Sequence, residues 1–95
     1  MWQVEIHTFN EAGHFHTQKF FEENKRGKEL VPYVHGEIEK LLKDGFVADD
    51  FRCRTEQNGK AKTIYTFCKE EQYVTDWVDI HIRQIEPNVE YEYEC

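Results

Sequence analysis

The chain has 95 residues, 39% of them hydrophobic and 15% aromatic, a composition typical of one globular domain over residues 1–95. Its 19 acidic and 12 basic residues give a formal net charge of -7, which argues against a nucleic-acid partner, because phosphate backbones are bound by clustered lysine and arginine. No apolar stretch is long enough for a membrane span and the first residues lack the pattern of a signal peptide, so we expect no membrane contact and a cytoplasmic protein.

The first strand is predicted over residues 2–9, where apolar and polar side chains alternate as they do in a half-buried strand. The segment NEAG that follows is typical of a turn. Residues 14–21 fit two descriptions, a second strand folded back on the first or a loop that carries phenylalanines onto the core. We favour the loop.

An amphipathic helix is predicted over residues 31–44. Apolar side chains recur there at helical spacing, with glutamates and lysines on the other side. Pro32 is tolerated only in the first turn of a helix, and Gly45 is a typical residue for ending one. The two residues therefore set the limits of this helix.

The clearest pattern in the chain is a β-hairpin over residues 46–69, with its turn at Asn58 and Gly59. A three-residue loop over 57–59, with Gly59 at positive φ, sets Phe51 opposite Tyr65 and places the apolar residues of both strands on one face. A shift of one residue would turn every side chain to the wrong side. We therefore predict this register, with Cys53 opposite Thr63.

Residues 72–86 match both a helix and a strand. Six residues fit one face of a helix, namely Val74, Trp77, Val78, His81, Ile82 and Ile85. In contrast, Val78, Ile80 and Ile82 alternate with polar residues as in a strand. We favour the helix, because a second helix would cover a sheet that one short helix leaves partly bare. Residues 88–95 alternate again and are predicted to form a final strand.

The predicted order is therefore β-α-β-β-α-β, a ferredoxin-like fold in which an antiparallel sheet carries two helices on one face. In each of the four predicted strands the apolar residues fall on a single side, as such a sheet requires. The alternative is a mainly antiparallel β-sheet with a single helix.

Charged residues on the open face of this sheet are the first candidate binding site. In the usual strand order of the fold, glutamates lie on one side of this face and arginines on the other. The residues are Glu5, Glu90, Glu92, Glu94, Arg52 and Arg54. A solvated sheet face explains such a pattern most simply. Functionally, the pattern predicts a small acidic, non-enzymatic protein that regulates or inhibits a protein partner, and a homodimer that salt weakens.

The histidines are the second set of candidates. His14 and His16 form an H-x-H pair whose rings point the same way on an extended segment, so they could hold a metal ion together with His7 or Glu11. Exposed loop histidines without a metal are the default interpretation.

His81 is the candidate general base of an alternative function, a small-molecule enzyme or ligand-binding protein. Its pocket would lie between helices and sheet and would be lined by Trp2, Tyr65, Trp77 and Tyr91. The sequence contains no catalytic motif, which favours a non-enzymatic protein without a cofactor.

Overall fold

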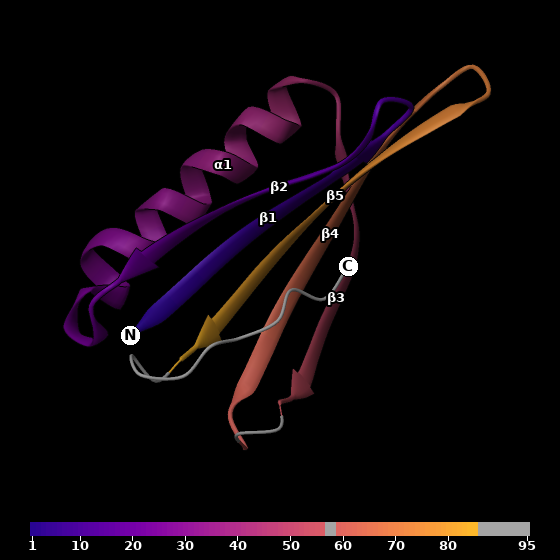
Figure 1. The fold of residues 1–95 in the computed structure, drawn as a ribbon. Helices are drawn as coiled ribbons and strands as arrows, with labels where there is room; N and C mark the ends of the chain where they lie inside the picture. Colours follow the sequence, from indigo (N-terminus) through magenta and orange to yellow (C-terminus); the bar gives the residue numbers. More distant parts are fainter. Residues whose placement is uncertain (57–58, 86–95) are drawn as a thin grey trace.

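The computed structural model describes residues 1–56 and 59–85. In these residues the chain forms a five-stranded antiparallel sheet with the order β2-β1-β5-β4-β3 and one α-helix, α1 (Figure 1). A short 3-10 helix and a π-helical turn lead into α1. The elements are β1 Trp2–Asn10, β2 Gly13–Phe21, the 3-10 helix Glu23–Lys25, the π-helix Arg26–Leu30, α1 Val31–Lys43, β3 Val47–Thr55, β4 Ala61–Glu71 and β5 Val74–Gln84.

The ferredoxin-like prediction is wrong, because the predicted second helix is the central strand β5, which pairs with both β1 and β4. The helical pattern required Trp77, Val78 and His81 to share a face. The segment instead follows the strand pattern, in which Val78 and Ile80 point to the same side and are buried toward α1. β-branched residues favour this extended conformation. The alternative, a mainly antiparallel sheet with a single helix, is confirmed.

The loop predicted for residues 14–21 is also wrong. This segment is β2, which pairs with β1 over its whole length, from Trp2 opposite Phe21 to Asn10 opposite Gly13. The turn between the strands is stabilised by the Ala12 N–H, which donates to Asn10 Oδ1 at 2.9 Å, and by Gly13 at a φ of +131°. The strand order expected for the sheet is wrong as well, since β1 lies between β2 and β5. The strand predicted over residues 88–95 lies outside the described residues.

The β3–β4 hairpin and the helix follow the sequence prediction. Phe51 lies opposite Tyr65 and Cys53 opposite Thr63, and Gly59 has a φ of +81°. Residues 57–58 of the predicted loop lie outside the described part of the chain. The helix α1 ends one residue earlier than predicted and is followed by Gly45 at a φ of +95°.

The apolar core lies between α1 and one side of the sheet, which we call the helix face. Its buried residues are Val4, Phe21, Leu30, Val34, Phe46, Phe67, Val78 and Ile80. In Figure 1, α1 runs beside β2 and β1, whereas β4 and β3 lie farther from it. Phe51 of β3 points to the helix face but is 59% exposed. One helix therefore covers only part of this face.

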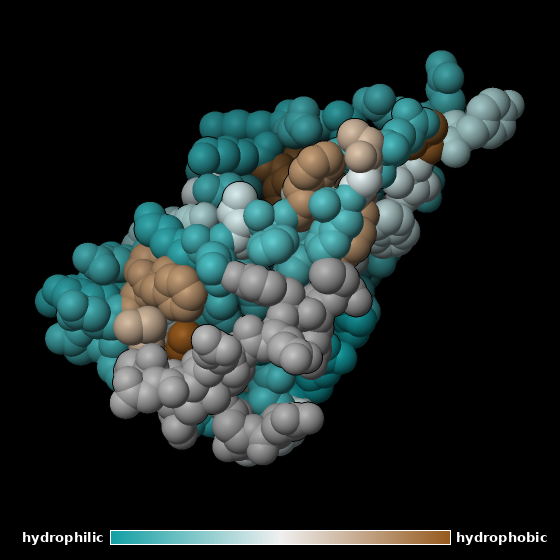
Figure 2. All heavy atoms as spheres, viewed as in Figure 1, coloured by the Kyte–Doolittle hydropathy of each residue, from teal (hydrophilic) through white to brown (hydrophobic). Residues whose placement is uncertain are grey.

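The opposite side of the sheet, the polar face, is buried in its middle although α1 does not lie on it. Its buried polar and charged residues are Gln3, Glu5, His7, Lys62, Thr66, His81 and Arg83, and the apolar Ile64 and Cys68 of β4 are buried on the same face. The surface in Figure 2 is mostly hydrophilic, with apolar residues gathered in a few patches. Among the described residues, no helix combines the length and the apolar character needed to cross a membrane.

Candidate metal site

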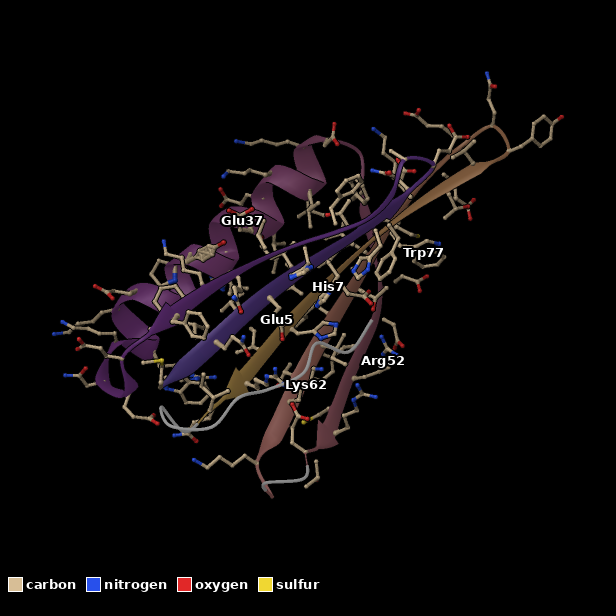
Figure 3. All side chains as sticks on the ribbon, viewed as in Figure 1. Glu5, His7, Glu37, Arg52, Lys62 and Trp77 are labelled. Carbon is tan, nitrogen blue, oxygen red and sulfur yellow. The ribbon has the colours of Figure 1, made fainter. Side chains whose placement is uncertain are left out.

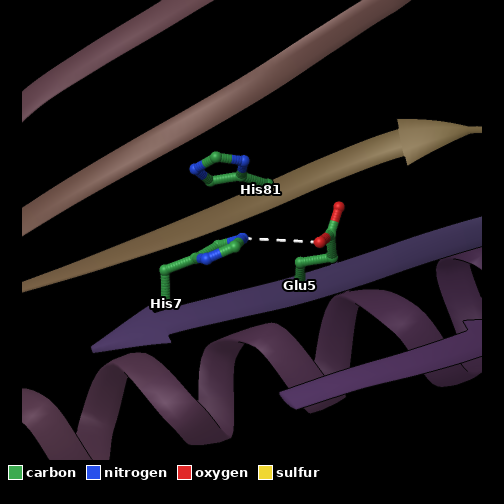
Figure 4. A group of neighbouring side chains, drawn as sticks. All are labelled: Glu5, His7 and His81. Carbon is green, nitrogen blue, oxygen red and sulfur yellow. Dashed lines mark ion pairs between the residues drawn. The ribbon is translucent and has the colours of Figure 1, made fainter. Parts of the chain in front are cut away.

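Two neighbouring strands bring Glu5, His7 and His81 together on the polar face. Glu5 and His7 are two residues apart in β1, so both side chains point away from the core that Val4 helps to form. The antiparallel pairing of β1 with β5 sets His81 opposite Glu5 and Asp79 opposite His7. Figure 4 shows the three side chains rising from the side of the sheet away from α1.

The geometry of this group suits a metal ion. One ligand atom from each of Glu5, His7 and His81 lies within 4.8 Å of the others. His7 Nε2 is 3.4 Å from Glu5 Oε2, and the centroids of the His7 and His81 rings are 4.6 Å apart. The residues are only 1%, 1% and 5% exposed, respectively. Three potential ligands therefore converge at a site that is largely shielded from solvent.

Several polar atoms of this group have no hydrogen-bond partner among the described residues. They are both carboxylate oxygens of Glu5, Nε2 of His7 and Nδ1 of His81. Burying such a group without a partner destabilises the folded state by about 1–3 kcal/mol. The unsatisfied atoms belong to the same three residues whose ligand atoms converge, so a single bound ion would give each of the three residues a partner.

The strand β2 adds two histidines beside this group. His16 lies opposite His7 and His14 lies opposite Phe9, and the His14 and His16 rings are on the same side of the strand. His7 Nδ1 and His14 Nε2 are 2.9 Å apart, so one ring donates a hydrogen bond to the other. The predicted H-x-H pair therefore flanks the buried group, and His14 can fix the tautomer and orientation of His7.

Charged residues surround the site on the same face. Glu5 Oε1 lies 3.3 Å from Arg83 Nη2, and Arg83 Nη1 donates to Glu56 Oε1 at 3.0 Å. Lys62 is fully buried on β4, and Asp79 lies two residues before His81 on β5, opposite His7. Figure 3 shows Glu5 and His7 on the sheet, Lys62 and Arg52 toward the β3 side, and Glu37 on α1. The histidines are thus surrounded by the carboxylates of Glu5, Glu56 and Asp79 and by the cationic side chains of Arg83 and Lys62.

The protonation states favour metal binding by His7. The pKa of His7 is lowered to about 4, mainly by burial and in part by the nearby charges of His81, His14, His16 and Lys62. Burial raises the pKa of Glu5, against the opposing charge of Arg83. At neutral pH the His7 ring is therefore neutral, which is the form of imidazole that coordinates metals.

The residues of the predicted charged surface do not come together in the described part of the chain. Glu5 is buried beside His7 and Arg83, whereas Arg52 and Arg54 lie exposed on β3 at the edge of the sheet. Arg52 pairs with Asp50 within its own strand, at 3.4 Å. Glu90, Glu92 and Glu94 lie outside the described residues.

The predicted small-molecule pocket is not assembled as expected. Trp2 and Tyr65 lie on the helix face, whereas Trp77 and His81 lie on the polar face. Tyr91 lies outside the described residues. A cavity of about 370 Å³ does lie between α1 and the sheet, with Leu41 and Ile80 in its lining, but His81 is not part of it.

Sequence analysis missed the pairing of Glu5 with His81, because it placed His81 on a helix. The available signal was the alternation of Asp79, His81 and Arg83 with isoleucines in a β-branched segment. Comparisons of the chain with models of protein families, with curated proteins and with solved structures gave no match. The site is therefore interpreted from its geometry alone.

Proposed function

We propose that this protein binds a divalent transition-metal ion through Glu5, His7 and His81. The observation that carries the proposal is the convergence of three buried side chains whose unsatisfied polar atoms face one another. His14 contributes by hydrogen bonding to the far nitrogen of the His7 ring, as the outer partners of metal-binding histidines do.

The ligand set indicates the class of metal. Two imidazoles and one carboxylate suit Zn²⁺ and the other first-row divalent ions, whereas Ca²⁺ and Mg²⁺ prefer oxygen ligands alone. Ligand atoms around such an ion lie roughly 3–3.5 Å apart, given metal–ligand distances of about 2.0–2.2 Å. The group, within 4.8 Å, would thus close by about 1 Å on binding, which small side-chain rotations achieve.

A metal-free arrangement of the same residues makes a different prediction. A proton held between His7 Nε2 and Glu5 Oε2 would link these two groups, which are 3.4 Å apart, without any ion. In that case His7 would be a structural residue, and added metal would bind no more tightly here than at exposed histidines elsewhere.

Titration of tag-free, chelator-treated protein with Zn²⁺ and Co²⁺ distinguishes the two arrangements. We expect one ion per chain with micromolar or tighter affinity, and visible Co²⁺ absorption bands that report nitrogen and oxygen ligands. His7→Gln and His81→Gln should each weaken binding at least tenfold. His35→Gln, at an exposed position on α1, is the matched control and should leave binding unchanged. Equal affinity in all four proteins would overturn the proposal.

The other functional expectations stay predictions. Regulation of a protein partner through charged residues would have to use Arg52, Arg54 and the glutamates of residues 90–94, because Glu5 is buried. No geometry in the described residues assigns a reaction, and a cytoplasmic location remains an expectation from the sequence.

A further inference from the structure

The strand β3 is an edge of the sheet, and its surface is unusual in three ways. All nine of its residues are exposed. Phe51 packs beside Tyr65, with ring centroids 5.1 Å apart, on a part of the helix face that leaves Phe51 59% exposed. Its charges are ordered along the strand, with Asp49 and Asp50 before Arg52 and Arg54. An exposed edge with an apolar face is a template for pairing with another strand.

The backbone at Phe51 shows which registers are open to a partner. The Phe51 N–H donates to Asp50 Oδ1 at 2.8 Å, so at this residue the N–H is directed to its own neighbour's side chain rather than into the β4 ladder. Along an edge strand, every second residue directs its N–H and C=O groups to the free edge. In β3 these are residues 51, 53 and 55, which can therefore hydrogen-bond to a partner strand. An antiparallel copy of β3 can therefore pair Phe51 with Phe51, Phe51 with Cys53, or Cys53 with Cys53.

Only one of these registers sets opposite charges against each other without also setting like charges against each other. Pairing Phe51 with its own copy sets Asp50 opposite Arg52 of the second copy, twice by symmetry. Pairing Phe51 with Cys53 sets Asp50 opposite Arg54 twice but also sets Arg52 against its own copy, and pairing Cys53 with its copy sets Arg52 against Arg54 twice. Like charges directly opposite each other destabilise a pair of strands, whereas opposite charges stabilise it.

We propose that a second copy of this chain docks on β3 in antiparallel register centred on Phe51, forming a two-fold symmetric dimer with one continuous sheet. The two Phe51 rings then meet beside both Tyr65 rings, on the part of the helix face that α1 leaves open. Asp50 exchanges its backbone contact and its ion pair with Arg52 of the same strand for an ion pair with Arg52 of the second copy. Such a contact is isologous, as expected of a closed dimer.

The other edge strand, β2, offers no comparable register. Lys19 is the one residue with a formal charge in Gly13–Phe21, so a second copy would find no complementary charge there. The bulge between Ala48 and Asp50 shortens the regular part of β3, and for this reason the β3 dimer is expected to be weak.

Sedimentation of reduced protein from low micromolar to millimolar concentration tests the proposal. The unaltered chain should form dimers as concentration rises. Asp50→Lys and Arg52→Glu should each raise the dissociation constant about tenfold or more, because each places like charges opposite each other twice. An equimolar mixture of the two variants should recover the dimer, since their heterodimer has opposite charges at both positions.

Two surface variants on α1 are the matched controls. Glu39→Lys changes the net charge as Asp50→Lys does, and Lys43→Glu changes it as Arg52→Glu does. Both should dimerise like the unaltered chain. Recovery in the mixture also shows that both β3 variants are folded. The proposal is overturned by an unaltered chain that stays monomeric up to millimolar concentration. It is equally overturned by single variants that dimerise normally, or by a mixture that dimerises no better than its components.

Discussion

The two faces of this sheet are both buried in their middle, but with opposite chemistry. On the helix face the buried residues are apolar and pack against α1, so every contact contributes to stability without requiring a specific partner. On the polar face most of the buried residues are polar or charged, and two histidines, a glutamate, a lysine and an arginine among them each need a partner to offset their lost hydration. The apolar burial that stabilises the fold is therefore concentrated on the helix face, whereas the buried groups that the proposed metal ion would use lie on the polar face.

The largest expected effect is on the helix face. Ile80 is fully buried against the core, so Ile80→Ala should lower the free energy of unfolding by about 2–4 kcal/mol. The measurement is denaturant unfolding followed by circular dichroism. His35→Ala at an exposed site should change the same free energy by less than about 0.5 kcal/mol. A small loss for Ile80→Ala would show that the helix face is not the stabilising side.

Bound metal should raise the free energy of unfolding through residues of the polar face alone. If Zn²⁺ binds only the folded protein, a concentration 100 times the dissociation constant raises the free energy of unfolding by about 2.7 kcal/mol. Thermal unfolding with and without Zn²⁺ measures the change. The gain should persist in a helix-face variant such as Val34→Ala and vanish in His81→Gln. A gain that survives in His81→Gln would place the metal elsewhere.

The helix face could be predicted from the sequence far better than the polar face. The alternation around Phe51 and Tyr65 determined the register of the β3–β4 hairpin, and helical spacing with Pro32 and Gly45 determined α1. These are local signals, carried by side chains within one or two neighbouring elements. A prediction of this kind needs no knowledge of the sheet order.

The candidate metal site depends on pairing between distant segments. Glu5 and His81 are 76 positions apart in the chain and meet only because β5 is inserted between β1 and β4. Residues 72–86 fit a helix nearly as well as a strand, and only the neighbouring strands decide between the two. Once β5 was predicted to be a helix, no local pattern could bring His81 to His7.

Acid should destabilise the metal-free protein through His7. Its pKa is lowered from 6.5 to about 4 on folding, so the unfolded chain takes up a proton first and stability falls as pH drops from 6.5 toward 4. The loss is about 3 kcal/mol by pH 4, since each pKa unit corresponds to about 1.4 kcal/mol. The groups facing His7 are Glu5 on β1, His14 and His16 on β2, Asp79 and His81 on β5, and Lys62 on β4.

Glu5 acts with the opposite sign. Its pKa is raised on folding, so the folded protein takes up that proton first and gains stability as pH falls through the raised value toward 4.5. Unfolding free energies between pH 7 and 4 in the presence of a chelator separate the two effects. His7→Gln should flatten the decline, and Glu5→Gln should steepen it. Parallel curves for all three proteins would show that neither group is linked to folding.

The smallest effect on the free energy of unfolding is expected where the helix face is uncovered. Phe51→Thr removes a ring that is 59% exposed in the monomer and keeps a β-branched residue suited to a strand. At high dilution it should change the free energy of unfolding by less than about 0.5 kcal/mol, far below the effect of Ile80→Ala on the same face. At millimolar concentration, however, it should abolish dimers, because the two rings form the centre of the proposed contact. If the dilute variant instead lost as much stability as Ile80→Ala, Phe51 would belong to the core of a single chain and β3 would have no surface reserved for a second copy.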